Sequence, residues 1–175
     1  MTDIMETPEQ GVSWQIASEA NYAEQLTRNN MARYYQSRGW RWDSTRYHAT
    51  WNETENVEVW HKGERVGIIR IALISKEAFE TNDEQTCLFV RDLQLDPSQQ
   101  GLGIGRACIE WVKHRAAQQG IKQVRLRVFS ENRAQALYRR MGFRVASEQD
   151  GLVEMALNLA QREPPALSAA SFPLR

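Results

Sequence analysis

Several features that would place a chain in a special class are missing from these 175 residues. The two cysteines, Cys87 and Cys108, are too few for a disulfide framework and too far apart for a zinc knuckle. No run approaches the roughly 18 apolar residues of a membrane-spanning helix. The N-terminus also lacks the basic and apolar parts of a signal peptide. These absences predict a soluble, cytoplasmic protein.

Glycine and proline are also scarce, with ten and five residues, which excludes a collagen-like or low-complexity chain. The content of 42% hydrophobic and 25% charged residues is typical of a globular protein. We therefore predict one domain over residues 1–160. Three of the five prolines follow Gln161, and we expect a disordered tail over residues 161–175.

Net charge is absent as well, because 22 basic residues balance 22 acidic ones. The distribution is uneven: residues 97–147 hold ten basic and two acidic side chains. Such a segment is either a solvated face or a site for an anionic ligand. No nucleic-acid recognition motif accompanies it, so we expect no nucleic-acid partner.

Hydrophobic periodicity predicts an α+β or α/β fold, a mixed sheet flanked by helices. Turn signals at Lys62-Gly63 and Asp150-Gly151 indicate two hairpins. The first dozen residues are expected to form a loose arm. The expected elements are a helix over 19–37, a hairpin over 56–73, a strand over 86–97, a helix over 104–119, a strand over 124–128, a helix over 132–141 and a hairpin over 143–159.

The most informative segment is a glycine cluster, Gln99–Arg106, between an expected strand and an expected helix. Glycines let the backbone approach a ligand, and a helix N-terminus favours a pyrophosphate. A P-loop is excluded because Arg106-Ala107 stands where Lys-Ser/Thr is needed. A Rossmann loop is excluded by the G-x-G-x-G spacing and by the lack of any acidic residue over 111–130.

The pattern Gln100-x-x-Gly103-x-Gly105 resembles the Q/R-x-x-G-x-G/A signature of the GNAT superfamily of acetyl-CoA-dependent N-acetyltransferases. The preceding segment 92–97 resembles the fourth strand of that family. The segment from Asn132 through Tyr138 to Gly142-Phe143 resembles its asparagine–tyrosine–glycine–phenylalanine helix motif. The similarity covers residues 88–145, about a third of the chain.

This resemblance implies a splayed mixed sheet that admits acetyl-CoA as cosubstrate, with no metal. It implies that the pantetheine arm meets the backbone of Leu93, Gln94 and Leu95, and that Asn132 helps to place the cofactor. The expected pyrophosphate loop is Gln100, Gly101, Leu102, Gly103, Ile104, Gly105 and Arg106. Lys113, Arg133 and Arg139 are open alternatives for the 3′-phosphate.

The resemblance also implies that Tyr138 is the general acid at the coenzyme sulfur, and that a backbone N–H near Leu95 stabilises the oxyanion. The alternative for Tyr138 is a packing role beside Leu137 and Met141. The general base is Asp92, Glu77 or water. Cys108 lies on an apolar stripe and is expected in the core.

The expected acceptor is a primary amine of a small molecule or peptide. Trp40, Trp42 and Trp51 either form a cage for it or fill the core. Over residues 1–96, 16 acidic residues outnumber ten basic ones, which favours a cationic acceptor. The alternative function is a catalytically silent acyl-CoA-binding sensor or interaction module. We expect no membrane partner, and homodimer formation is left open.

Overall fold

One seven-stranded sheet organises the computed structural model, which describes residues 11–75 and 86–159. The strand order is β1-β2-β3-β4-β5-β7-β6, and every neighbouring pair is antiparallel except β4 and β5, which are parallel. The strands are β1 (Val12–Ile16), β2 (Glu55–His61), β3 (Glu64–Ile74), β4 (Cys87–Leu95), β5 (Gln123–Phe129), β6 (Arg144–Gln149) and β7 (Leu152–Asn158).

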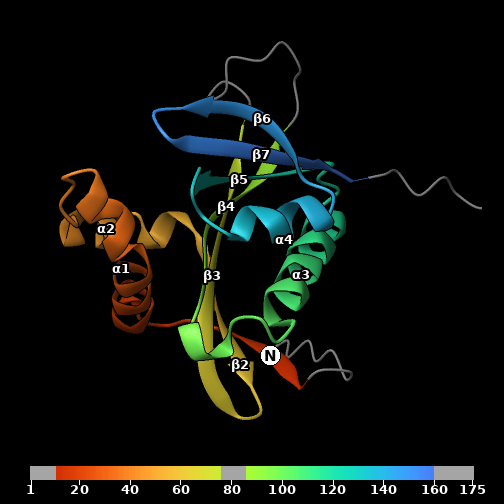
Figure 1. The fold of residues 1–175 in the computed structure, drawn as a ribbon. Helices are drawn as coiled ribbons and strands as arrows, with labels where there is room; N and C mark the ends of the chain where they lie inside the picture. The colour runs from red at the N-terminus through yellow and green to blue at the C-terminus, as the bar shows by residue number, and fades with distance from the viewer. Residues whose placement is uncertain (1–10, 76–85, 160–175) are drawn as a thin grey trace, which may run out of the picture.

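Helices cover both faces of this sheet. Helices α1 (Ala20–Ser37) and α2 (Ser44–Ala49) lie on one side of β3, and α3 (Ile104–Gln118) and α4 (Ala134–Arg140) lie on the other (Figure 1). Seven consecutive residues of β3 are buried. A strand covered on both faces loses the polar alternation of a half-exposed strand, which explains the continuous apolar run around Ile68 and Ile69.

Two hydrophobic clusters fill the space beneath the helices. On one side, α3 buries a stripe at helical spacing, Ile104, Cys108, Ile109, Val112 and Ala116. On the other side, α1 and α2 pack Ala23, Leu26 and Tyr47 against Ile68 of β3. The sheet therefore separates two packed layers.

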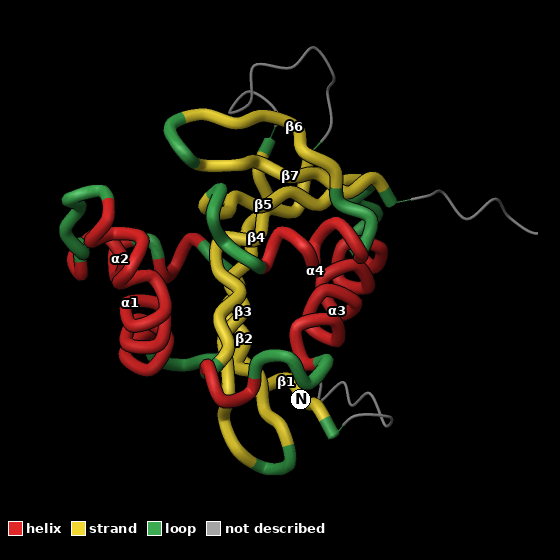
Figure 2. Tube along the Cα trace, viewed as in Figure 1, coloured by secondary structure: helices red, strands yellow, loops and turns green. Residues whose placement is uncertain are grey.

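Both predicted hairpin turns are confirmed. The central residues have positive φ in each: 51° and 81° at Lys62 and Gly63, and 52° and 74° at Asp150 and Gly151. Positive φ at both positions is the requirement of a type I′ turn, whose twist matches that of the strands. Strands β5, β7 and β6 cross above the ends of β2–β4 (Figure 2).

The structure confirms the mixed α+β sheet and adds one strand, β1, and one short helix, α2. Strand β1 was not expected: it is five residues long and pairs with β2, more than 40 positions away. Residues 1–10 of the expected arm, Glu77 and the expected tail over 161–175 lie outside the described residues.

Candidate active site

The sheet opens between its two parallel strands. Strand β4 pairs with β5 over Leu88–Val90 alone and continues to Leu95 paired only with β3. A bulge marks the parting, because Ile71 pairs with Val90 while Arg70 pairs with Asp92. The extra residue in a bulge bends its strand and increases the local twist. The predicted splay of the sheet is thus present.

The backbone at the open edge of β4 alternates in direction. The amide of Asp96 donates to the carbonyl of Val66 on β3 at 2.8 Å, so the backbone of Gln94, two residues earlier, also faces β3. The backbones of Leu93 and Leu95 consequently face the opening. The Leu95 carbonyl accepts from Asn30 Nδ2 at 2.9 Å and Gln100 Nε2 at 3.3 Å. The N–H groups of Leu93 and Leu95 and the Leu93 carbonyl are what this edge offers a ligand.

The predicted glycine loop lies just beyond this edge. Gly101 and Gly103 have φ of 77° and 85°, and Gly103 is the N-cap of α3 with no side-chain cap. The N–H groups of the first helical turn have no acceptor within the helix, so this end of α3 suits an anion.

The rest of the glycine motif belongs to α3 itself. Ile104 is buried in the core, and Arg106 is exposed. A Cβ on Gly105 would lie 3.0 Å from Leu137 Cδ2, so this glycine permits close packing of α3 against α4. Its role is packing between helices, in addition to any backbone contact with a ligand.

A cavity of about 1020 Å³ lies along the opening, on the side of α1 and α2. It brings together five of the predicted site residues, Asp92, Leu93, Gln94, Asn132 and Tyr138. Leu95 and residues 100–106 do not line it. The predicted site therefore has two parts: a backbone loop at α3 and a side-chain cavity at the parting of the strands.

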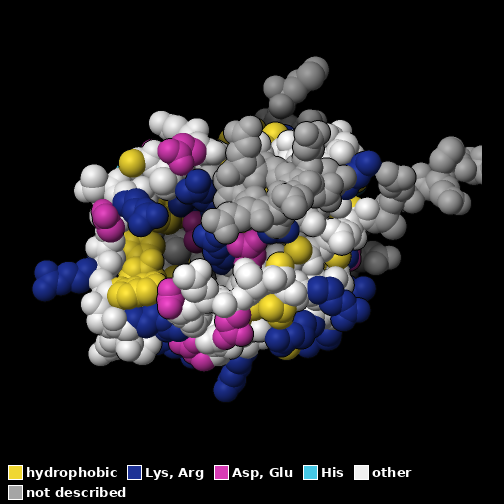
Figure 3. Space-filling model, turned by 90° about the horizontal axis from the view of Figure 1, so that it is seen from above, with side chains coloured by type: hydrophobic (Ala, Val, Ile, Leu, Met, Phe, Trp, Pro, Cys, Tyr) yellow, Lys and Arg dark blue, Asp and Glu magenta, His cyan; other side chains and the backbone are white. Residues whose placement is uncertain are grey.

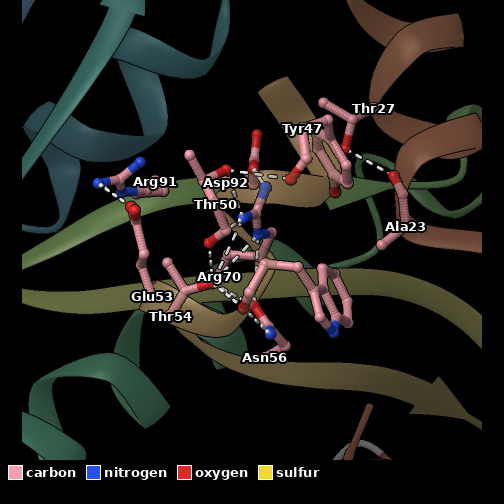
Figure 4. Close-up of polar contacts among 11 residues, drawn as sticks. Ala23, Thr27, Tyr47, Thr50, Glu53, Thr54, Asn56, Arg70, Arg91 and Asp92 are labelled. Atoms are coloured by element: carbon pink, nitrogen blue, oxygen red, sulfur yellow. Dashed lines mark hydrogen bonds and ion pairs between the residues drawn. The ribbon is translucent and has the colours of Figure 1, made fainter. Parts of the chain in front are cut away.

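Asp92 lies in a polar network within this cavity. Its Oδ2 accepts from Arg70 Nη1 at 3.2 Å, and Arg70 also donates to Thr50 and lies near Thr54 and Asn56 (Figure 4). Arg70 is 2% exposed, and its guanidinium lies 4.4 Å from the ring centroid of Tyr47. A buried guanidinium needs such partners to offset its lost hydration.

Burial raises the pKa of Asp92 to about 6, although the Arg70 guanidinium opposes that shift. A carboxylate with a pKa near 6 is ionised at neutral pH and is a stronger base than a solvated aspartate. Its position in the cavity and its pKa both make Asp92 suited to accept a proton.

Tyr138 approaches from the other side of the opening. It lies on α4, is 7% exposed, packs against Phe143 at 5.8 Å between ring centroids, and lines the cavity. Burial raises its pKa above the ordinary value of a phenol, so the hydroxyl is protonated at neutral pH. The Tyr138 side chain therefore belongs both to the hydrophobic core and to the cavity lining.

Asn132 caps the turn that begins α4. Its Oδ1 accepts from the amide of Ala134 at 2.9 Å, and its side-chain NH₂ is the group left for a ligand. Among the candidates for the 3′-phosphate, Lys113 pairs with Glu110 at 3.3 Å. Arg139 donates to a glutamine of its own helix, whereas Arg133 is exposed at the α4 N-cap.

Ring contacts through Tyr35 and Tyr47 link the three tryptophans, but Trp51 does not line the cavity. Trp40 and Trp42 line the cavity, and Trp42 donates to Glu24 Oε1 at 2.8 Å. Trp51 packs beside Tyr47, with the Arg70 guanidinium 5.3 Å from its ring. The aromatic surface at Trp51 and Tyr47 is therefore occupied by an arginine of the protein itself.

Two residues of the site, Arg70 and Asn30, were not predicted from the sequence. An arginine inside the run Val66–Leu73 was a usable signal, because a charge buried in a strand requires partners. Asn30 joins α1 to β4 through Gln94 Oε1 at 3.1 Å and the Leu95 carbonyl, and nothing in its surrounding sequence marks that role.

Residues 11–75 and 86–159 hold no group of three or more His, Cys, Asp or Glu side chains that could bind a metal. None of the described helices is long and apolar enough to cross a membrane. Cys108 is fully buried in the core, as predicted, and burial raises its pKa to about 12.

A sequence profile described as "Acetyltransferase (GNAT) family" matches residues 17–143. The chain belongs to this family. The resemblance seen over residues 88–145 therefore extends towards the N-terminus through α1, α2 and the β2–β3 hairpin. A search of curated proteins by sequence finds no match.

Solved structures share the GNAT fold with this chain. NAA60 of Arabidopsis thaliana, solved with a bisubstrate analogue, is 15% identical with a TM-score of 0.63 over 85% of this chain and 99% of its own. The PaiA N-acetyltransferase of Thermoplasma acidophilum, solved with coenzyme A, is also 15% identical, with a TM-score of 0.63 over 84% and 98%. The ribosomal-protein-S18-alanine N-acetyltransferase of Escherichia coli is 17% identical, with a TM-score of 0.61 over 88% and 97%. At these identities the likeness concerns the GNAT fold alone.

Proposed function

We propose that this GNAT protein is an acetyl-CoA-dependent N-acetyltransferase that acetylates a primary amine of a small molecule or peptide. The observation that carries the proposal is the opening between β4 and β5, where Asp92 and Tyr138 line one cavity from different elements. Direct attack in a ternary complex fits such an opening, because a cosubstrate and an acceptor can enter from different sides.

The residues present fit acetyl-CoA. The N–H and carbonyl of Leu93 at the open edge would hold the pantetheine amides, and residues 100–106 with the α3 N-terminus would hold the pyrophosphate. The side-chain NH₂ of Asn132 is a further donor. When bound, acetyl-CoA supplies the acetyl thioester.

Proton movement is assigned to two side chains. Transfer forms an N–C bond and breaks a C–S bond, so one proton must leave the amine and one must reach the sulfur. Asp92 accepts the amine proton, directly or through water, because it is ionised above its pKa of about 6. Tyr138 donates to the sulfur, since its phenol remains protonated at neutral pH. The N–H of Leu95 donates to the carbonyl oxygen during attack.

The test is a screen of primary amines with acetyl-CoA, following thiol release and detecting the acetylated amine by mass spectrometry. We expect turnover with at least one amine class and none without amine. Tight acetyl-CoA binding without turnover across a broad panel would contradict the enzyme and favour the silent acyl-CoA-binding sensor.

A further inference from the structure

The cavity wall has an excess of positive charge. Among the described residues, its charged lining consists of five arginines and two aspartates: Arg41, Arg46, Arg70, Arg91, Arg127, Asp43 and Asp92. This contrasts with the acidic excess of residues 1–96, which had favoured a cationic acceptor. The charge of the cavity lining therefore differs in sign from the net charge of residues 1–96.

Carboxylates only partly offset this charge. Arg70 pairs with Asp92. Arg91 lies 3.5 Å from Glu53, a long contact on an exposed surface. The single Glu154 carboxylate serves both Arg127, at 3.0 Å, and Arg125, at 2.6 Å.

Arg41 and Arg46 form no ion pair with any carboxylate of residues 11–75 and 86–159. Both are exposed: Arg41 precedes Trp42 in the connection from α1 to α2, and Arg46 lies in α2. Asp43, between them, uses its Oδ1 to accept from the Arg46 amide at 2.8 Å. Figure 3 shows dark-blue basic side chains at the edge of a hollow beside a group of hydrophobic side chains.

Arg41, Arg46 and Asp92 line the same cavity, together with Tyr35 of α1. Burial raises the pKa of Tyr35, and the charges of Asp92 and Arg46 have smaller, opposite effects on it. The lining also includes the apolar side chains of Met31, Trp42 and Phe129.

We propose that the acceptor is an amine that also carries an anionic group, a carboxylate or a phosphate, which Arg41 and Arg46 bind while the amine faces Asp92. This inference rests on the proposed function, because it names the acceptor class of the same site. Guanidinium groups form strong charge-assisted hydrogen bonds with both anions. An acceptor with a second positive charge would instead meet like charges at the cavity edge.

The test uses amines that differ only in the group opposite the amine: para-(aminomethyl)benzoate, its neutral carboxamide, the corresponding phosphonate and the diamine para-xylylenediamine. Affinity is measured by calorimetry with coenzyme A present, and thiol release is measured separately with acetyl-CoA. We expect an anionic member to bind about tenfold more tightly than the carboxamide, with the advantage shrinking in high salt. The carboxylate and phosphonate arms distinguish the two anions.

The variant Arg41→Gln/Arg46→Gln should reduce this preference to within about twofold, if both guanidiniums bind the anion. Arg28→Gln, at an exposed position of α1 outside the cavity, is the matched control and should leave it intact. Equal or tighter binding of the carboxamide or diamine, or a preference that survives in the double variant, would overturn the inference. A binding preference without thiol release would instead count against the proposed function.

Discussion

The two sides of the opening are built by different means. The cofactor side, with the loop 100–106, α3 and α4, comes from one continuous stretch of chain and relies on backbone N–H groups and glycines. The acceptor side gathers side chains from α1, α2, β3 and β4. The first is a property of local backbone conformation, whereas the second exists only after distant segments pack together.

The two sides also differ in the cost of burying polar groups. Gly101 and Gly103 are exposed, so the cofactor loop leaves polar backbone groups hydrated until a ligand arrives. The acceptor side buries Arg70 and much of Asp92, whose side chain is 16% exposed, and must satisfy both within the protein. Substitutions on the cofactor side should therefore affect acetyl-CoA binding, and substitution of Asp92 on the acceptor side should affect proton transfer.

The largest effect is expected from Gly103→Asp on the cofactor side. The new carboxylate would oppose the pyrophosphate and disturb the amides that receive it, so we expect the Kd for acetyl-CoA to rise more than about 1000-fold. Calorimetry measures this loss.

The matched control is Gly120→Asp. Gly120 follows the other end of α3 with φ of 68°, and nothing lies within 4 Å of an added Cβ. Both variants carry a similar backbone penalty, and only the first should lose acetyl-CoA. Equal affinities for the two variants would place the phosphate site elsewhere.

On the acceptor side, Asp92→Asn removes the proposed base and keeps an oxygen for Arg70. We expect kcat at pH 7.5 to fall roughly 100- to 1000-fold with little change in the Kd for acetyl-CoA. In the wild type, kcat/KM should fall as the pH drops through about 6, because Asp92 becomes protonated. The variant should lack that acidic limb, and a limb that persists would assign it to another group.

The titration of Asp92 would not cause the expected acidic limb by unfolding the protein. The folded-state pKa of Asp92 lies above its ordinary value, so its contribution to stability is fully present below about pH 4 and is lost as the pH rises through about 6. This carboxyl therefore makes the protein more stable, not less, as the pH falls across that window. Thermal unfolding at pH 5.5 and 7.5 provides the check.

Tyr138→Phe tests the point where the two sides meet. The substitution keeps the ring and its contact with Phe143, so the fold and acetyl-CoA binding should be retained. We expect kcat to fall about 100-fold, near the lower end of the range for general acids, because a thiolate is a good leaving group. A kcat within about twofold of wild type would leave Tyr138 with a packing role. Tyr22→Phe, outside the cavity lining, is the control.

The smallest effect is expected from Asn30→Ala, which cuts a link between the two sides. The Asn30 amide donates to Gln94 Oε1 and the Leu95 carbonyl, so its loss should lower the free energy of unfolding by about 1–2 kcal/mol. Urea titration measures the change. A several-fold rise in the KM for acetyl-CoA should accompany the loss of stability. An unchanged KM would show that the Asn30 contacts do not affect acetyl-CoA binding at the open edge of β4.

The same contrast explains what the sequence could predict. The glycine loop, both hairpin turns and the α3 stripe were predictable because local spacing and φ requirements determine them. Strand β1, the Arg70 network and the Asn30 link were not, because each depends on a partner at least 14 positions away. The positive charge of the acceptor side was also not predicted, because the numbers of acidic and basic residues over 1–96 do not show which side chains line the cavity.

Amide hydrogen exchange, followed by NMR with and without acetyl-CoA, tests most directly whether acetyl-CoA binds in the β4–β5 opening. The amides of Leu93 and Leu95 face the opening, whereas that of Gln94 faces β3. We predict that acetyl-CoA slows exchange at Leu93 and Leu95 and leaves Gln94 slow in both states. Unchanged exchange at Leu93 and Leu95 in the presence of bound acetyl-CoA would contradict the assignment of the β4–β5 opening as its binding site.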